Sequence, residues 1–252
     1  MAKKNLKSLV TLPTYTLYVK SLDKKIEYEP FVVAEQKNLL MAAKSKDPTE
    51  IIRAMSNLVD SCVTERNFKA ADLPIFELIH IFLNIRAVSV EELIDLKYRC
   101  NAEIKVENDE GVEEAGKCTN EIPIRINIQD VQISYPEEVN DSVMLTDTLG
   151  VKLRYPNIKD LQSIQGKDDE EITTDMIAQC IVAIFDDSGV YPSDEYETAE
   201  LVEFLESLSS KQFVKIRTFF EDMPKLEHTV KFTCNKCKTK HEVVLSDIAD
   251  FF

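Results

Sequence analysis

Alternating apolar and polar positions near the start of the chain predict a β-hairpin. Its strands are expected at residues 15–19 and 25–28, and the chain leaves the second strand at Pro30. Successive side chains of a strand point to opposite faces, so this spacing gives the ribbon one apolar face. The first element is therefore predicted to be a two-stranded antiparallel ribbon.

Helical spacing replaces the alternation after Pro30. A helix at 33–44 precedes one that begins at Asp47 and Pro48, because Asp is a favoured N-cap and Pro fits the first helical position. A third helix is expected near residues 74–85, and its apolar residues extend beyond one face. This third helix should lie at the centre of the fold.

The pattern then returns to that of strands. Short strands are expected at 92–98, 104–106, 143–145 and 151–155, and the apolar alternation at 122–133 predicts another strand. Together these segments predict an antiparallel β region in the middle of the chain.

The last third is predicted to be helical before it ends in a ribbon. Helices are expected at 172–185 and 197–208, and another helix should be capped by Ser209 or Ser210. A tight turn and strand spacing at 229–245 then predict a C-terminal β-ribbon.

These elements predict an α+β protein. Its expected parts are an N-terminal hairpin and helical region at 1–91, an antiparallel β region at 92–160, a helical region at 161–228 and a C-terminal Cys-x-x-Cys ribbon at 229–252 that packs on the β region.

Two cysteine segments far apart in the chain repeat one pattern. Each segment begins with an aromatic-x-Cys-Asn sequence, which contains Cys100 in the first and Cys234 in the second. Each ends with Lys-Cys, at Cys118 and at Cys237. Zinc favours four such ligands, so these cysteines are candidates for one structural zinc site, with His241 as an alternative ligand. Seventeen residues separate the first pair, and four reduced thiols in ordinary β packing are the other interpretation.

Composition restricts the class of partner. The chain of 252 residues carries a net charge of −15 and a pI near 4.7, which disfavours nucleic acid, because binding there requires Lys and Arg to neutralise phosphates. A protein or a cationic partner fits better, although acidity also serves solubility. No apolar stretch is long enough to span a membrane, and six cysteines without a signal peptide indicate a reducing cytoplasm.

The sequence shows no catalytic motif. It lacks a phosphate-binding glycine loop, a nucleophile elbow and a His-Glu-x-x-His helix. His80 lies in the most apolar helix, where a core histidine is the simpler interpretation, and Cys62 and Cys180 sit in apolar helical patterns typical of small buried side chains. The chain is therefore not expected to be an enzyme.

Four N-terminal segments are distinctive: Leu12-Pro13, residues 30–42, residues 73–77 and above all residues 82–91, which read Phe-Leu-Asn-Ile-Arg-Ala-Val-Ser-Val-Glu. Together they resemble the baseplate hub assembly proteins of T4-like contractile-tailed phages. The resemblance implies an assembly or scaffolding role among other hub or tail proteins, without catalysis. It also implies a place in the host cytoplasm during tail assembly or in the virion baseplate.

Four residues are candidates for contact with such partners. Arg86 interrupts the apolar end of the third helix, and Glu197, Glu200 and Glu203 belong to an acidic helix face that continues to Glu206. A structural role for the arginine and a merely solvated acidic face are the alternatives. The same features would also suit a zinc-ribbon adaptor of a cellular complex.

Overall fold

A computed structural model of the chain describes residues 10–45, 47–107, 113–136, 140–163 and 169–245. The helices are α1 (Val33–Ser45), α2 (Pro48–Cys62), α3 (Ile75–Ser89), α4 (Ile158–Ser163), α5 (Asp169–Gln179), α6 (Thr198–Ser207) and α7 (Ser210–Glu221). The strands are β1 (Tyr15–Val19), β2 (Lys24–Tyr28), β3 (Leu93–Arg99), β4 (Glu103–Glu107), β5 (Glu113–Lys117), β6 (Glu121–Asn127), β7 (Gln132–Ser134), β8 (Ser142–Met144), β9 (Gly150–Leu153), β10 (Ile181–Asp186), β11 (Gly189–Pro192), β12 (Lys225–Thr233) and β13 (Lys240–Leu245). Helices and antiparallel sheets share the chain, which confirms the predicted α+β class.

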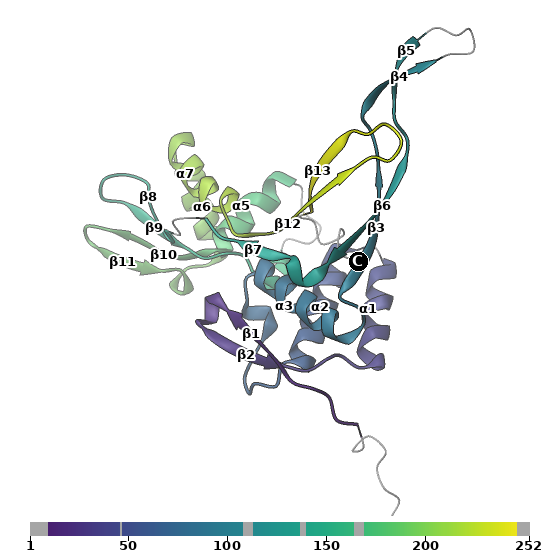
Figure 1. The fold of residues 1–252 in the computed structure, drawn as a ribbon. Coiled ribbons are helices and arrows are strands. Elements are labelled where there is room, and N and C mark those ends of the chain that lie inside the picture. Colours follow the sequence, from purple (N-terminus) through teal and green to yellow (C-terminus); the bar gives the residue numbers. More distant parts are fainter. Residues whose placement is uncertain (1–9, 46, 108–112, 137–139, 164–168, 246–252) are drawn as a thin grey trace, which may run out of the picture.

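The N-terminal hairpin and three helices form as the sequence predicts. β1 pairs with β2, and α1, α2 and α3 lie side by side in that order in Figure 1. Asp47 caps α2 by accepting a hydrogen bond from the Thr49 amide at 2.9 Å. α3 buries side chains around most of its surface, including the fully buried Phe82, so it forms the centre of the larger hydrophobic core.

A buried carboxylate ties three elements of this part together. Glu77 of α3 is 3% exposed and accepts hydrogen bonds from the Ser21 amide at 2.9 Å and from the Tyr135 hydroxyl at 3.2 Å. The turn after β1 and the segment after β7 are thereby held on α3. His80, one helical turn further along, lines a cavity of about 310 Å³ with Glu77 and Tyr135.

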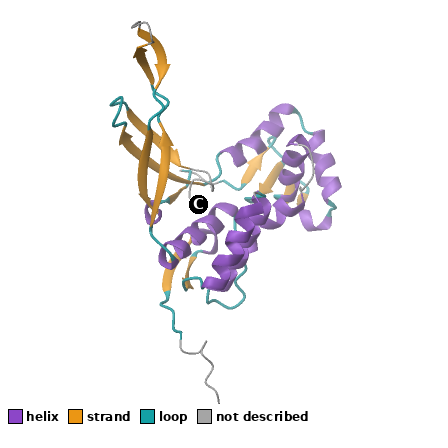
Figure 2. Ribbon diagram, turned by 90° about the vertical axis from the view of Figure 1, so that its right-hand side faces the viewer, coloured by secondary structure: helices purple, strands orange, loops and turns teal. Residues whose placement is uncertain are grey.

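Two ribbons form the β region. β3 pairs with β6, while β12 pairs with β13 and, at its other end, with β7. Each ribbon turns some of its apolar side chains inward, with Ile94 and Ile126 of one and Leu226 and Leu245 of the other in the larger core. β4 and β5 pair only with each other, and Figures 1 and 2 show this arm projecting away from the body.

The predicted strand at 122–133 is interrupted. A short 3-10 turn at Ile128–Asp130 separates β6 from β7, and Asn127 caps it by accepting from the Gln129 amide. Ile128 and Val131 are nevertheless buried. Buried apolar positions therefore continue through the turn, and the apolar pattern in the sequence does not show that the strand is broken there. The two strands consequently join different sheets.

The predicted helix at 172–185 is wrong in its second half. α5 ends at Gln179, and β10 begins at Ile181 and pairs with both β9 and β11. A short apolar run such as Ile181–Asp186 has no period that separates a buried helix from a buried strand. The four-stranded sheet and helices α5 to α7 enclose a second, smaller core, seen as the separate lobe in Figure 2.

Aromatic and ionic contacts join the two lobes. The Tyr155 ring stacks on Phe219 of the smaller core, with centroids 4.9 Å apart, and meets Phe76 of the larger core edge-on at 5.4 Å. Nearby, the Asp160 carboxylate, whose side chain is 4% exposed, receives two hydrogen bonds from Arg154 at 2.6 and 2.8 Å. The predicted domain limits at 91, 160 and 228 stay a prediction.

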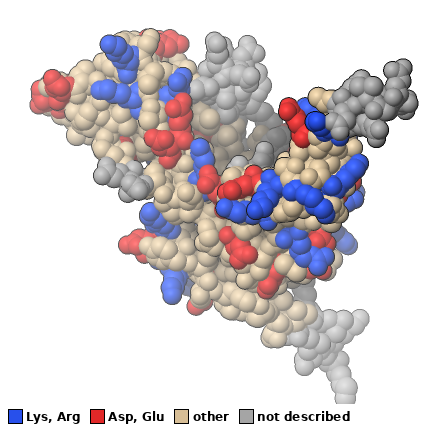
Figure 3. Space-filling model, turned by 45° about the horizontal axis from the view of Figure 1, so that its top comes forward, with Lys and Arg blue, Asp and Glu red and all other residues tan. Residues whose placement is uncertain are grey.

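The surface is not uniformly acidic. On the face drawn in Figure 3, Lys and Arg side chains gather in a row over one part, with Asp and Glu side chains among and beyond them. None of the helices that the structure describes is long and apolar enough to cross a membrane.

Candidate metal centre

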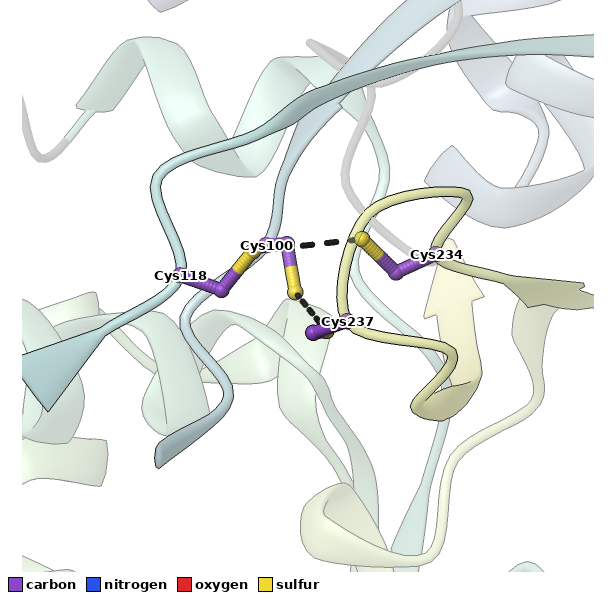
Figure 4. A group of neighbouring side chains, drawn as sticks. All are labelled: Cys100, Cys118, Cys234 and Cys237. Atoms are coloured by element: carbon purple, nitrogen blue, oxygen red, sulfur yellow. Dashed lines mark hydrogen bonds between the residues drawn. The ribbon is translucent and has the colours of Figure 1, made fainter. Parts of the chain in front are cut away.

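The four predicted cysteines converge at the base of the arm. Cys100 follows β3, Cys118 stands between β5 and β6, and Cys234 and Cys237 lie in the turn between β12 and β13. Cys100, Cys118 and Cys234 have no exposed surface, and Cys237 is partly buried. Figure 4 shows the four side chains pointing toward one another.

The sulfur positions match a tetrahedral metal site. All four Sγ atoms lie within 4.8 Å of one another, with Cys100 and Cys237 3.6 Å apart and Cys118 and Cys234 3.9 Å apart. Four sulfurs placed about 2.3 Å from one zinc ion would be about 3.8 Å apart along each edge. The residues therefore fit zinc in ligand type, number and spacing.

The long spacing of the first pair comes from the arm. The intervening residues run out along β4 and return along β5, so Cys100 and Cys118 meet again across the ribbon. Backbone hydrogen bonds hold this junction, from the Cys100 amide to the Asn120 carbonyl at 2.8 Å and from the Cys118 amide to the Ala102 carbonyl at 2.9 Å. The arm thus lies in the sequence between two cysteines, Cys100 and Cys118, that are close together in space.

The second pair forms a tight knuckle. The Cys234 amide donates to the Thr239 carbonyl at 2.9 Å, and the Lys238 amide donates to the Cys234 carbonyl at 3.0 Å. Lys238 adopts a positive φ of 61°, which closes the turn. This geometry places both sulfurs on the side that faces Cys100 and Cys118.

The thiols differ in their electrostatic surroundings. Hydrogen bonds from the backbone amides of Cys237 and Lys236 lower the pKa of the Cys234 thiol to about 6. Burial instead raises the pKa of the Cys100 thiol to about 12. The knuckle thus stabilises a thiolate, the form that binds metal, even before the other ligands are considered.

His241 lies beside the cluster. Its Nε2 atom is 3.2 Å from Cys100 Sγ, and its ring packs against Phe232 and Tyr98 with centroid distances of 5.3 Å each. The four cysteines form the compact set without it, so the geometry favours the all-cysteine ligand set over the alternative with His241.

One residue at the site was missed by the sequence reasoning. The Asn120 amide nitrogen lies 3.5 Å from Cys234 Sγ and donates to Asn235 Oδ1 at 2.6 Å. Its position two residues after Cys118, near the repeated Cys-Asn pattern, was the available signal. The side chain links the first cysteine pair to the knuckle.

The remaining cysteines are buried elsewhere, as predicted. Cys62 ends α2 in the larger core, and Cys180 follows α5. Burial raises the pKa of each thiol to about 12. Both therefore remain protonated at neutral pH and behave as small apolar side chains.

Arg86 lies in the last turn of α3. The side chain is partly buried, its Nη1 atom is buried without a hydrogen-bond partner in the part of the chain described, and desolvation lowers its pKa. The Phe31 amide donates a hydrogen bond to Ser89 Oγ at 2.9 Å, which holds the end of α3 against the segment that precedes α1. Contact of Arg86 with a partner stays a prediction.

The acidic face of α6 is exposed, but part of it is used locally. Glu197 and Glu200 form a capping box, in which the Glu197 amide donates to Glu200 Oε2 at 2.9 Å. Glu203 and Glu206 are exposed on the same helix. Of the predicted carboxylates, the structure brings Glu197 and Glu200 together in this cap, and the contact of the acidic face with a partner stays a prediction.

Comparisons with known proteins lead to phage baseplates. The family described as T4 bacteriophage base plate protein matches residues 12–252. The baseplate hub assembly protein gp26 of Enterobacteria phage T4 is 27% identical over 199 residues, which cover 75% of this chain and 85% of that protein. No solved structure gives a significant match.

Proposed function

Because the chain belongs to the T4 bacteriophage base plate protein family, we propose that it is an assembly factor for the central hub of a contractile-tail baseplate. The observation that carries the proposal is the family match over residues 12–252, together with a relative named for hub assembly. Family membership also favours this role over that of a zinc-ribbon adaptor in a cellular complex.

The chain acts by binding other hub or tail proteins and not by catalysis. It works in the host cytoplasm while tails assemble and can remain in the baseplate of the virion. Its protruding arm and exposed helix faces support a binding role, since such elements offer contact surfaces that the chain itself does not fill.

A structural zinc ion held by Cys100, Cys118, Cys234 and Cys237 completes the proposal. The sulfur distances and the thiolate-stabilising knuckle support it. Four protein ligands leave no coordination position for water, so the ion would fasten the C-terminal ribbon to the β3–β6 ribbon and supply no hydrolytic chemistry. Metal analysis of protein purified without chelator should give one zinc per chain.

Capture from tail-producing cells tests the assembly role. An affinity-tagged full chain should recover baseplate hub proteins, identified by mass spectrometry, well above an equally tagged unrelated protein. Cells that lack the chain should accumulate tails with incomplete hubs. Normal hubs without the chain, together with no recovery of any baseplate protein, would refute the proposed function.

A further inference from the structure

Among the residues that the structure describes, α1 presents an exposed face. The face consists of Val33, Lys37, Leu40, Met41 and Lys44, which recur at helical spacing on one side of α1. Val33 is 67% exposed, Leu40 is 54% exposed and Met41 is 71% exposed. α1 packs on α2 at the edge of the helical part, and Figure 1 shows no other element beyond it.

The exposed apolar side chains recur along one side of α1, with Val33 at its start and Leu40 and Met41 two turns later. Val32, 42% exposed, extends the group at the start of the helix, whereas Leu39 is the buried side chain of α1. Single exposed apolar residues are ordinary on a protein surface, but a contiguous set marks an interaction site. Met41 adds an unbranched, adaptable side chain of the kind common on binding surfaces.

The charge on this face is opposite to that of the whole chain. Lys37 and Lys44 flank the apolar side chains, and the face includes no acidic residue. The one carboxylate of α1, Glu35, is turned to the helix start, where it accepts a hydrogen bond from the Val32 amide at 2.7 Å. In a protein of net charge −15, α1 therefore offers a locally basic, apolar stripe.

We infer that this face of α1 docks an acidic amphipathic helix of another baseplate protein, an inference that rests on the proposed function. Apolar side chains of the partner would cover Leu40 and Met41, and its carboxylates would meet Lys37 and Lys44. Two lysines on a helix already packed against α2 are too few for a membrane-surface helix, which needs a strongly basic polar face. A second copy of this acidic chain is disfavoured because α6, its exposed acidic helix, buries its own Leu201 and Leu205.

Capture of hub proteins by the tagged full chain provides the first test. Leu40→Ser/Met41→Ser should reduce the recovered partner at least about tenfold, because a few central apolar contacts dominate such interfaces. The matched control, Val190→Ser/Val214→Ser, removes apolar side chains that are 67% and 46% exposed on the other lobe and should leave capture unchanged. Circular dichroism melting should be unaltered in both variants, since these side chains are exposed.

Charge reversal tests the stated chemistry of the partner. Lys37→Glu/Lys44→Glu should weaken capture about tenfold at low salt, and the loss should shrink in high salt, where screening weakens charge attraction. Lys25→Glu/Lys211→Glu changes the net charge equally at exposed sites away from this face and should have no effect. Recovery of the partner that is unchanged by charge reversal at positions 37 and 44 would overturn the inference.

Photo-crosslinking identifies the occupant directly. The photoreactive residue p-benzoylphenylalanine, placed at Met41 of the full chain, should crosslink to a segment with apolar helical spacing flanked by Asp or Glu, and the same residue at Val190 should not. Crosslinks to lipid, to a second copy or to a basic segment would each overturn the inference. If the wild type recovers baseplate proteins but position 41 gives no crosslink, the inference fails alone; if it recovers none and hubs form normally without the chain, the proposed function fails as well.

Discussion

Replacing Cys234 by Ser should destabilise the protein in a way that depends on zinc. Cys234 is fully buried, and hydrogen bonds from the backbone amides of Cys237 and Lys236 favour its thiolate form. Serine preserves the size of the side chain but is a poor zinc ligand, so the substitution should impair the site with little change in packing. The comparison that matters is therefore the effect of a chelator before and after the substitution.

The structure sets the size of the effect. The cluster joins positions as far as 137 residues apart in the sequence, as between Cys100 and Cys237. Treated as a cross-link of that span, the metal would stabilise the fold by roughly 5 kcal/mol through the lost entropy of the unfolded chain. For a protein of this size, that corresponds to a decrease in melting temperature of roughly 10 to 20 °C when the metal is removed.

The assay is thermal unfolding followed by circular dichroism, with and without a zinc chelator. The melting temperature of the wild type should fall by the full amount when chelator is added. Cys234→Ser should melt near the temperature of the chelated wild type, and chelator should change its melting temperature little. Cys180→Ala is the matched control, because it removes a buried thiol that lies outside the cluster. This variant should be less stable than the wild type because it loses buried packing contacts, but chelator should lower its melting temperature as much as it lowers that of the wild type.

Two results would refute the reasoning. One is a wild-type protein that contains well below one zinc per chain, whose six thiols all react with a thiol reagent in the native state and whose melting temperature chelator does not change. The other is a Cys234→Ser protein that keeps the whole chelator effect. Either would mean that the cluster is held by packing and hydrogen bonds alone, as the alternative interpretation of four reduced thiols requires.

Further substitutions test the packing and charge of the rest of the fold. Gly150→Ala should destabilise the smaller lobe by about 1–3 kcal/mol in thermal melts, because its Cβ would overlap a phenyl ring of β10, whereas Gly189→Ala, with open space around it, should be near neutral. Asp160→Ala should lower the free energy of unfolding by about 3 kcal/mol in urea titrations, since the half-buried Arg154 guanidinium loses its carboxylate partner and keeps only its hydrogen bonds to backbone carbonyls. Burial lowers the pKa of His80 below its usual 6.5, so the free energy of unfolding should fall as pH drops below about 6.5, and His80→Asn should flatten that slope. Arg86→Met should leave the melting temperature unchanged or raise it slightly, because the aliphatic stem is kept and a buried nitrogen without a hydrogen bond is removed; a marked decrease would show that the guanidinium stabilises the fold.

The first third of the fold was predictable because each signal there is local. The N-cap at Asp47 with Pro48, the apolar stripe of α2 and the all-round apolar surface of α3 each depend on neighbouring residues alone. The hairpin also follows from adjacent alternation. In these segments intrinsic preference and tertiary packing act in the same direction.

The errors occur where long-range pairing decides. The run from Ile181 has no period that distinguishes helix from strand, and its pairing with β9, well before it in the sequence, makes it the strand β10. The break at Ile128–Asp130 has the same cause, since β6 and β7 pair with different strands. The acidic turn after β10, in contrast, was predictable, because Asp186 accepts from the amides of Ser188 and Gly189 within the turn itself.

The position of the cysteine cluster explains why such a site is useful there. The two ribbons leave the larger core as they extend toward the arm, and the small apolar cluster around the cysteines is separate from that core. A two-stranded hairpin such as β4–β5 is only marginally stable alone in water. The arm lengthens the interval between Cys100 and Cys118, so spacing in the sequence is a poor guide to this site. At the base of the arm, four thiolates around one ion would add stability that hydrophobic burial cannot provide.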